Sequence, residues 1–166
     1  MMFDTHTNRR LFEEHAAVLD LLARVEARLT GRAGPYPPPA GDGAWGSLAR
    51  DLAAGIEGEV ARHFAFEEEK LFPLLAEAGE GDLAELLLEE HGSIREAAEP
   101  VRALARQSLT GPLSDVEWAT LRTFGLELCE RLGAHARKED LSLLPALEGL
   151  LDADLDRALF EDYALA

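Results

Sequence analysis

The sequence contains a single cysteine, Cys129, among its 166 residues. One cysteine allows neither an internal disulfide nor a Cys-x-x-Cys redox pair, and it excludes a metal site built from several thiolates. We interpret Cys129 as a small apolar filler, because no histidine lies within one helical turn of it. Any metal would have to be bound by imidazole and carboxylate groups.

Long hydrophobic runs are also missing, although hydrophobic residues make up 47% of the chain. No segment approaches the apolar length of a membrane-spanning helix. The first residues, Met1 to His6, lack the basic and apolar regions of a secretory signal. We therefore expect a cytoplasmic protein that has no membrane partner.

Basic residues are scarce relative to acidic ones. The chain has 16 lysines and arginines against 32 aspartates and glutamates, which gives a formal net charge of −16. A field of this sign repels phosphate backbones and concentrates cations. We expect no nucleic-acid partner.

Strand patterns are almost absent, whereas apolar residues recur with helical spacing along most of the chain. The length suits one domain, so we expect a single all-α domain over residues 1–166 with its core at about 8–147. The predicted helices run from about Thr7 to Leu29, from about Trp45 to Leu71 or beyond, from about Asp82 to the loop at 109–113, from Ser114 to about Pro145, and, as a short acidic helix packed across the bundle, from about Asp152 to Tyr163.

Capping residues and prolines predict the helix boundaries. Thr7 is the expected N-cap of the first helix, and Ser114 with a glutamate three residues later is typical of a capping box. Pro73 is expected to bend or end the second helix, and Pro100 to kink the third. The segment 31–43 contains Gly-Pro-Tyr-Pro-Pro-Pro and is predicted to be an extended crossover loop at the edge of the functional site.

Four of the five histidines belong to a pattern that occurs twice. Glu-Glu-His stands at 13–15 and again at 89–91, and His-x-x-x-Glu stands at 63–67 and again at 135–139. Each His-x-x-x-Glu block has a proline ten residues after its histidine. A spacing of four places the imidazole and the carboxylate on the same face of a helix.

Each of the four long helices carries one of these histidines on its apolar stripe. In an up-down-up-down four-helix bundle, the repeat would bring all of them to one place in the core. One histidine alone would be interpreted as an ordinary core residue, but burying the whole set without a cation would be costly. The neighbouring glutamates at 13, 14, 68, 69, 89 and 90 are interpreted as solvated or as hydrogen-bond acceptors for the ligands. The candidate metal ligands are His15, His63, Glu67, His91, His135 and Glu139.

This order of residues resembles the hemerythrin-like HHE cation-binding domain family over roughly residues 8–147. The resemblance implies a four-helix bundle with a non-heme di-iron centre. Glu67 and Glu139 would bridge the two irons, and the four histidines would be terminal ligands, two for each iron. An oxo or hydroxo bridge and an exogenous molecule would complete the coordination. Zinc and manganese accept the same donor atoms.

Two positions depart from the pattern of the oxygen-carrying hemerythrins. Those proteins have a further histidine four residues after the third-helix ligand, where this sequence has Arg95. They also use His-x-x-x-x-Asp in the fourth helix, which Asp140 satisfies, so Asp140 competes with Glu139 as the bridge. The internal repeat favours Glu139. For Arg95 the sequence leaves open an ion pair with a carboxylate such as Glu67 or Glu139, a hydrogen bond to a bound anion, or exposure at the bundle edge.

The resemblance implies that the protein binds oxygen, nitric oxide or iron itself, as a sensor, store or scavenger rather than as a dedicated enzyme. One alternative is a di-iron oxidoreductase with ferroxidase or peroxide-consuming activity, to which the acidic surface would supply ferrous ions. A further alternative is an interaction module in which the metal is structural and its coordination sphere is closed. The sequence leaves the oligomeric state and any protein partner open.

Overall fold

The computed structural model describes residues 3–165, and every regular element in that range is helical. The all-α prediction is therefore confirmed. The elements are α1 (His6–Thr30), α2 (Gly43–Ile56), η1 (Glu57–His63), α3 (Phe64–Phe66), η2 (Glu67–Leu71), α4 (Phe72–Glu77), α5 (Gly81–Ser108), α6 (Asp115–Leu141), α7 (Leu143–Glu148) and α8 (Ala153–Leu165).

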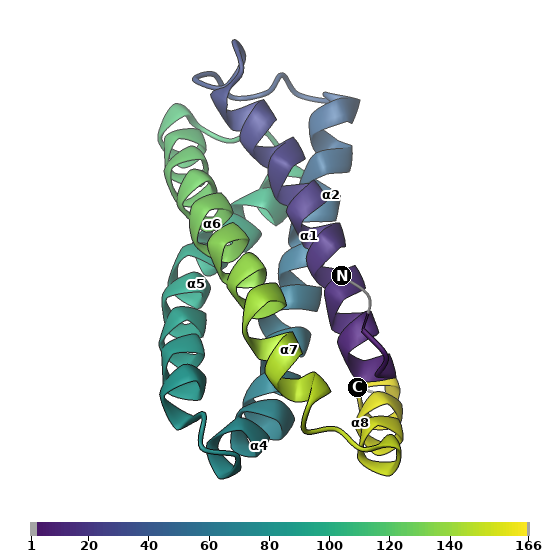
Figure 1. Ribbon diagram of the computed structural model, residues 1–166. Coiled ribbons are helices and arrows are strands. Elements are labelled where there is room, and N and C mark those ends of the chain that lie inside the picture. Colours follow the sequence, from purple (N-terminus) through teal and green to yellow (C-terminus); the bar gives the residue numbers. More distant parts are fainter. Residues whose placement is uncertain (1–2, 166) are drawn as a thin grey trace.

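The long helices pack side by side as a bundle (Figure 1). α1 lies against α6 and α2, and α5 lies against the same two helices. α8 is the predicted acidic helix, and it packs beside the first turns of α1, at the lower right of Figure 1. Within residues 3–165, no helix is both long and apolar enough to cross a membrane.

The apolar side chains form two separate buried clusters, and α1 and α5 contribute to both. In α1, Leu11 belongs to the smaller cluster and Val18 to the larger one. In α5, Leu87 and Ile94 are divided in the same way. The second and fourth helical stretches reach the smaller cluster through α4 and α7, and polar residues occupy the level between the two clusters.

The first turn of α1 is capped by carboxylates that come from the other end of the chain. Asp156 in α8 accepts hydrogen bonds from the backbone N–H groups of His6 (2.8 Å) and Thr7 (2.9 Å). Glu148 accepts one from the N–H of Thr5 (3.1 Å), the residue before the helix. The prediction that Thr7 is the N-cap was wrong, because α1 begins at His6 and Thr5 occupies the N-cap position. Distant acceptors satisfy the free N–H groups of this turn.

The predicted capping box of α6 is confirmed. The Ser114 hydroxyl accepts a hydrogen bond from the Glu117 N–H (3.2 Å), and the Glu117 carboxylate accepts one from the Ser114 N–H (2.8 Å). α6 ends at Leu141, four residues before the predicted end, and a short helix then carries Pro145. α5 continues through Pro100 to Ser108.

The second helical stretch contains two π-helical segments, η1 and η2, which the sequence did not predict. His63 is the last residue of η1 and Glu67 is the first residue of η2. π-Segments often occur at functional sites, and apolar spacing alone does not distinguish them from α-helix. Pro73 does not end the stretch, because it lies in the first turn of α4, where no N–H is needed, and the helix continues to Glu77.

The loop 31–42 lies at the end of the bundle where α1 ends and α2 begins (Figure 1). The carbonyl of Gly34 accepts a hydrogen bond from the Trp118 indole (2.8 Å), and the Trp118 ring packs edge-on against Trp45. At a rise of about 1.5 Å per residue, this loop is roughly 20 Å along α1 from His15. The prediction that it borders the functional site was wrong.

Candidate metal centre

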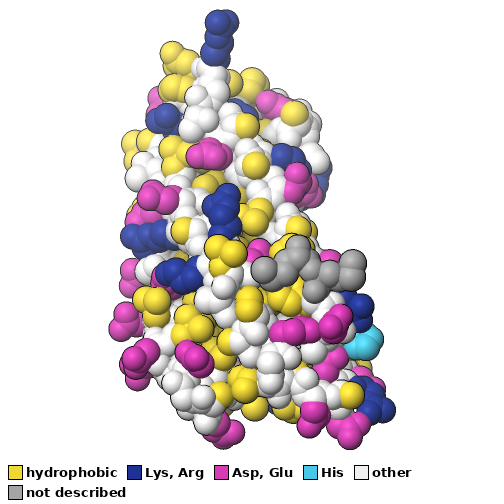
Figure 2. Space-filling model, viewed as in Figure 1, with side chains coloured by type: hydrophobic (Ala, Val, Ile, Leu, Met, Phe, Trp, Pro, Cys, Tyr) yellow, Lys and Arg dark blue, Asp and Glu magenta, His cyan; other side chains and the backbone are white. Residues whose placement is uncertain are grey.

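The structure brings all six candidate ligands together in the polar layer between the two apolar clusters. Each of them is at most 2% exposed. Burial of this set also explains why histidine is visible at only one place on the face shown in Figure 2. The residues come from four helical stretches: His15 from α1, His63 and Glu67 from the π-segments, His91 from α5, and His135 and Glu139 from α6.

His15, His63, Glu67 and Glu139 form one group that could hold a metal ion, which we call the first position. The Nε2 atoms of His15 and His63 are 3.3 Å apart. Glu67 Oε1 lies 2.9 Å from the Nε2 of His63, and Glu139 Oε2 lies 3.1 Å from the Nε2 of His15. Two nitrogen and two oxygen donors therefore face one another.

His91, His135, Glu67 and Glu139 form a second group of the same kind, which we call the second position. The Nε2 atoms of His91 and His135 are 3.0 Å apart. Glu139 Oε1 lies 2.9 Å from the Nε2 of His135, and Glu67 Oε2 lies 3.3 Å from the Nε2 of His91. Each glutamate thus presents one oxygen to each position, which is the arrangement of a bridging carboxylate.

The other ring nitrogen of each histidine contacts a carboxylate outside the layer. An ionised carboxylate only accepts hydrogen bonds, so Nδ1 carries the proton and donates it. The neutral ring then presents the Nε2 lone pair to the centre, as a metal ligand does. The pairs are His15 with Asp140 (2.6 Å), His63 with Glu14 (3.0 Å), His91 with Glu68 (2.8 Å) and His135 with Glu90 (2.8 Å).

The electrostatics of the layer require positive charge. Burial would lower the pKa of His15, but the carboxylates of Asp140 and Glu139 beside its ring outweigh this effect and raise the pKa to about 9. Burial would also lower the pKa of His91, but its contacts with Glu139 and Glu67 outweigh burial and raise this pKa to about 9. Burial would raise the pKa of Glu139, but its histidine partners hold that pKa well below the ordinary value. The glutamates therefore stay ionised.

Protons do not satisfy this layer well. If both histidines of a pair carried a proton on Nε2, two N–H groups would face each other across 3.3 Å at the first position and 3.0 Å at the second. Oxygen Oε2 of Glu67 and both carboxylate oxygens of Glu139 are buried without a hydrogen-bond partner. A metal cation at each position would accept the nitrogen lone pairs and neutralise these oxygens.

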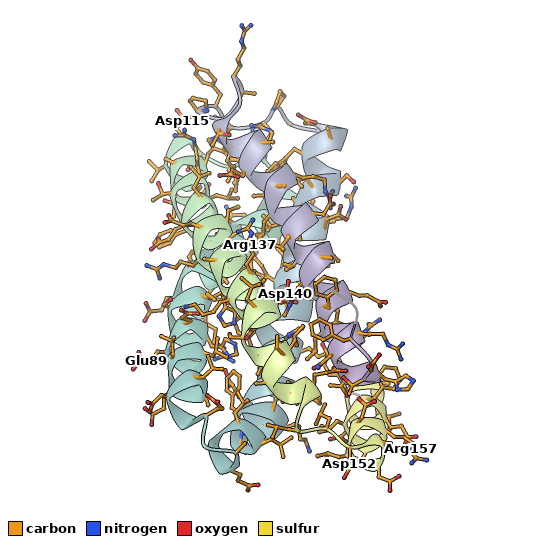
Figure 3. All side chains as sticks on the ribbon, viewed as in Figure 1. Glu89, Asp115, Arg137, Asp140, Asp152 and Arg157 are labelled. Carbon is orange, nitrogen blue, oxygen red and sulfur yellow. The ribbon has the colours of Figure 1, made fainter. Side chains whose placement is uncertain are left out.

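The sequence left Asp140 as an alternative to Glu139 for the bridging position, but Asp140 does not occupy that position. Its Oδ1 accepts the hydrogen bond from His15 Nδ1, and Figure 3 shows it on α6 beside α1. Glu139, one residue earlier, faces the Nε2 atoms instead. The internal repeat explains both roles, because Glu68 follows Glu67 and also hydrogen-bonds a histidine of another helix.

Arg95 pairs with the carboxylate of Glu68 and not with Glu67 or Glu139, the two examples that the sequence suggested. Its guanidinium lies 2.7 Å from Glu68 Oε1, and its side chain is 41% exposed. The Arg95 guanidinium carbon also lies 5.5 Å from the ring centre of Phe64, which stacks on His91 at 3.6 Å. Arg95 therefore contacts the groups that hold His91 in place, and Phe64 covers one face of that ligand.

Two further residues near the centre were not singled out from the sequence. Glu59 lies one helical turn before His63, and its Oε2 is 3.4 Å from the His63 Nδ1. A glutamate four residues before a ligand was the available signal for it. The Tyr163 hydroxyl in α8 donates to Glu14 Oε2. No local spacing connects Tyr163 to the motif, because the two are distant in the sequence.

Comparisons with known proteins agree with this geometry. A family model described as the hemerythrin HHE cation-binding domain matches residues 6–147. A search of the curated proteins found no match. The matched range includes all six candidate ligands and stops before α8. The chain therefore belongs to the hemerythrin HHE cation-binding domain family, as its repeated motif had indicated.

Proposed function

We propose that this protein binds two iron ions within an up-down-up-down four-helix bundle. His15 and His63 would ligate one ion, His91 and His135 the other, and Glu67 and Glu139 would bridge them. The observation that carries the proposal is the convergence of four Nε2 atoms and two unpaired carboxylates in one buried layer. The outer carboxylates on Nδ1 support it, because metal-binding histidines commonly donate their second N–H in this way.

Iron is the metal that the family resemblance favours. Imidazole and carboxylate donors suit iron, and bridging carboxylates tolerate both its ferrous and its ferric charge. The same donors accept zinc and manganese, so the assignment of iron rests on the family and not on the geometry. Iron would supply redox and ligand-binding chemistry, while the chain's own residues hold it and exclude bulk water.

We further propose that the centre binds a small exogenous molecule, such as oxygen or nitric oxide, and acts as a sensor, store or scavenger. Each position offers two imidazole nitrogens and two shared carboxylate oxygens, fewer donors than an octahedral iron accepts. A cavity of about 290 Å³ between α5 and α6 is lined by His135 and Ile94. A small molecule could approach the second position from this side.

Metal analysis followed by spectroscopy tests the proposal. After anaerobic loading with ferrous iron and removal of excess metal, two irons per chain are expected. The optical spectrum should change on addition of oxygen, and again on addition of azide. One iron or less per chain would contradict the two-metal centre. Two irons with no spectral response would indicate a structural metal, and sustained turnover of oxygen or peroxide would indicate an oxidoreductase.

A further inference from the structure

The two metal positions have matching ligands, but their surroundings carry different charge. The repeat aligns His63 with His135, and it therefore aligns the residue four places before each of them. That residue is Glu59 beside the first position and Arg131 beside the second. The equivalent places thus differ by two units of charge.

Glu59 is a buried carboxylate whose charge is not balanced by a lysine or arginine among residues 3–165. Its side chain is 7% exposed, and among residues 3–165 its one ion-pair contact is the 3.4 Å approach to the His63 Nδ1, which already donates to Glu14. A carboxylate in this place would gain from a nearby cation. Glu59 lines a cavity of about 460 Å³ between α1 and η1.

Arg131 places a guanidinium at the matching point beside the second position. It donates to the carbonyl of Ser93 (2.9 Å), pairs with Glu127, and lines the cavity that reaches His135. Glu127 offsets the charge of Arg131, so a cation bound by His91 and His135 would lack the additional carboxylate that Glu59 supplies at the first position.

The carboxylates that hold the histidines are accompanied by two cations at each position. At the second position, each is neutralised, Glu68 by Arg95 (2.7 Å) and Glu90 by Lys138. At the first position, Glu14 pairs with Arg10 at 2.8 Å and with Arg62 at 2.9 Å. It also accepts a hydrogen bond from the Tyr163 hydroxyl. Asp140 has no lysine or arginine partner within residues 3–165. The charges of these groups cancel at both positions, so Glu59 is the group that makes the first position the more negative.

We propose that the first position binds its divalent cation before the second and more tightly, and that Glu59 sets this order. The inference rests on the proposed two-metal function and goes beyond it, because the repeat alone predicts two equal sites. An extra carboxylate beside His63 stabilises a cation there, whereas the equivalent residue beside His135 is an arginine that is paired with Glu127.

Cobalt(II) is a suitable probe, because its visible absorption reports binding directly. The metal-free protein is titrated in oxygen-free buffer against a competing chelator, and two dissociation constants are obtained. We expect them to differ by at least about tenfold, which corresponds to about 1.4 kcal/mol at 25 °C. In crystals grown with one equivalent of cobalt, the anomalous signal should lie between His15 and His63.

Glu59→Gln should weaken the tighter constant by about tenfold and leave two cobalt ions per chain, since the amide keeps the shape and removes the charge. Glu57→Gln is the matched control, because it removes the same charge from an exposed position of η1 and should change neither constant. Arg131→Gln provides an independent arm that does not depend on the folding of the Glu59 variant. It should strengthen the weaker constant.

Equal constants in the unmodified protein, or earlier filling between His91 and His135, would overturn the inference and leave the two-metal function intact. The same holds if Glu59→Gln and Glu57→Gln bind cobalt identically. Absence of any cobalt binding would instead refute the proposed function itself, so the two failures are distinguishable.

Discussion

At the scale of single residues, the two nitrogens of each histidine have different partners. Nε2 faces the centre, and Nδ1 donates to a carboxylate that lies outside it. Glu139 and Asp140 show how adjacent acids divide these roles, because successive helical residues are turned by about 100°. Glu139 faces the ligand atoms of three histidines, whereas Asp140 only orients His15.

Substitutions at these two acids should have different effects on metal content. Glu139→Gln removes a charge that both positions share, so we expect iron content to fall well below two per chain. Asp140→Asn should keep two metals, because its amide oxygen still accepts from His15, but should weaken the first position by about ten- to a hundredfold. Metal analysis and cobalt competition measure both effects. Loss of metal from Asp140→Asn alone would assign the bridge to Asp140.

The raised pKa values of His15 and His91 predict how the stability of the metal-free protein depends on pH. Both pKa values rise from 6.5 to about 9 on folding. A group whose folded pKa is raised stabilises the fold fully below its unfolded pKa, and this contribution is lost as pH rises through the folded value. The urea concentration at the unfolding midpoint of the metal-free protein should therefore decrease as the pH is raised from 6.5 to 9.

The metal-loaded protein is the control for this pH effect. Protons and metal compete for the same Nε2 atoms, so metal affinity should increase over the same pH range. Titration with cobalt at pH 6.5 and pH 9 checks the direction. A metal-free protein whose urea midpoint rises with pH in this interval would contradict the assignment of the histidines as proton acceptors.

The six candidate ligands could be predicted from the sequence because helical spacing and an internal repeat place them on matching faces. The outer carboxylates were harder to predict. Glu14 and Glu68 are sequence neighbours of ligands, but each contacts a histidine of another helix, and spacing along one helix does not reveal that. The contact between Tyr163 and Glu14 depends on where α8 packs, which no local pattern specifies.

At the scale of the elements, α8 caps the N-terminus of α1, although the two helices are at opposite ends of the sequence. Asp156 lies in α8, and its carboxylate accepts from the first two N–H groups of α1 and from the His6 ring (3.0 Å). These hydrogen bonds outweigh the effect of burial, which would raise the pKa of Asp156, and lower it to about 2. Since α1 carries His15, the packing of α8 supports the helix that positions a ligand.

Asp156→Ala should destabilise the protein by about 1–2 kcal/mol, because it leaves the first N–H groups of α1 without their acceptor. The free energy of unfolding in urea measures this loss. Asp154→Ala is the control, since its side chain is 91% exposed on the same helix, and its effect should stay within about 0.5 kcal/mol. Equal effects of the two substitutions would mean that the cap contributes nothing to stability.

The helices were predictable as elements, but their internal geometry was not. Apolar spacing located α1, α5 and α6 within a few residues, and the capping box located the start of α6. The π-segment η1 ends at His63 and η2 begins at Glu67, so both lie where the ligands enter the buried layer. Hydrophobic periodicity averages over such local changes and therefore predicts one continuous α-helix.

At the scale of the whole molecule, metal binding should stabilise the fold. A ligand that binds only the folded state adds about 4.1 kcal/mol for one site when its free concentration is a thousand times its dissociation constant. We therefore expect ferrous iron, added anaerobically, to raise the melting temperature of the metal-free protein and a chelator to reverse the increase. Differential scanning calorimetry measures both changes.

A variant with His15→Ala and His91→Ala is the control for this measurement, because it removes one ligand from each position. Acidic side chains are spread over the face shown in Figure 2, and they offer weak alternative sites. If iron binds in the buried layer, the melting temperature of the variant should not respond. An equal increase in both proteins would place the stabilising iron on the surface instead.

The division of the core into two apolar clusters also defines the alignment of the helices. A helix that slid by one turn, about 5.4 Å, would still bring apolar side chains to a similar face, because its apolar positions recur with the helical period. Its histidine, however, would then lie beside the apolar side chains of its neighbours, and its hydrogen-bonded carboxylate partner would be lost. The polar layer therefore fixes the axial register of the helices, and it selects one register among several that hydrophobic packing alone would allow.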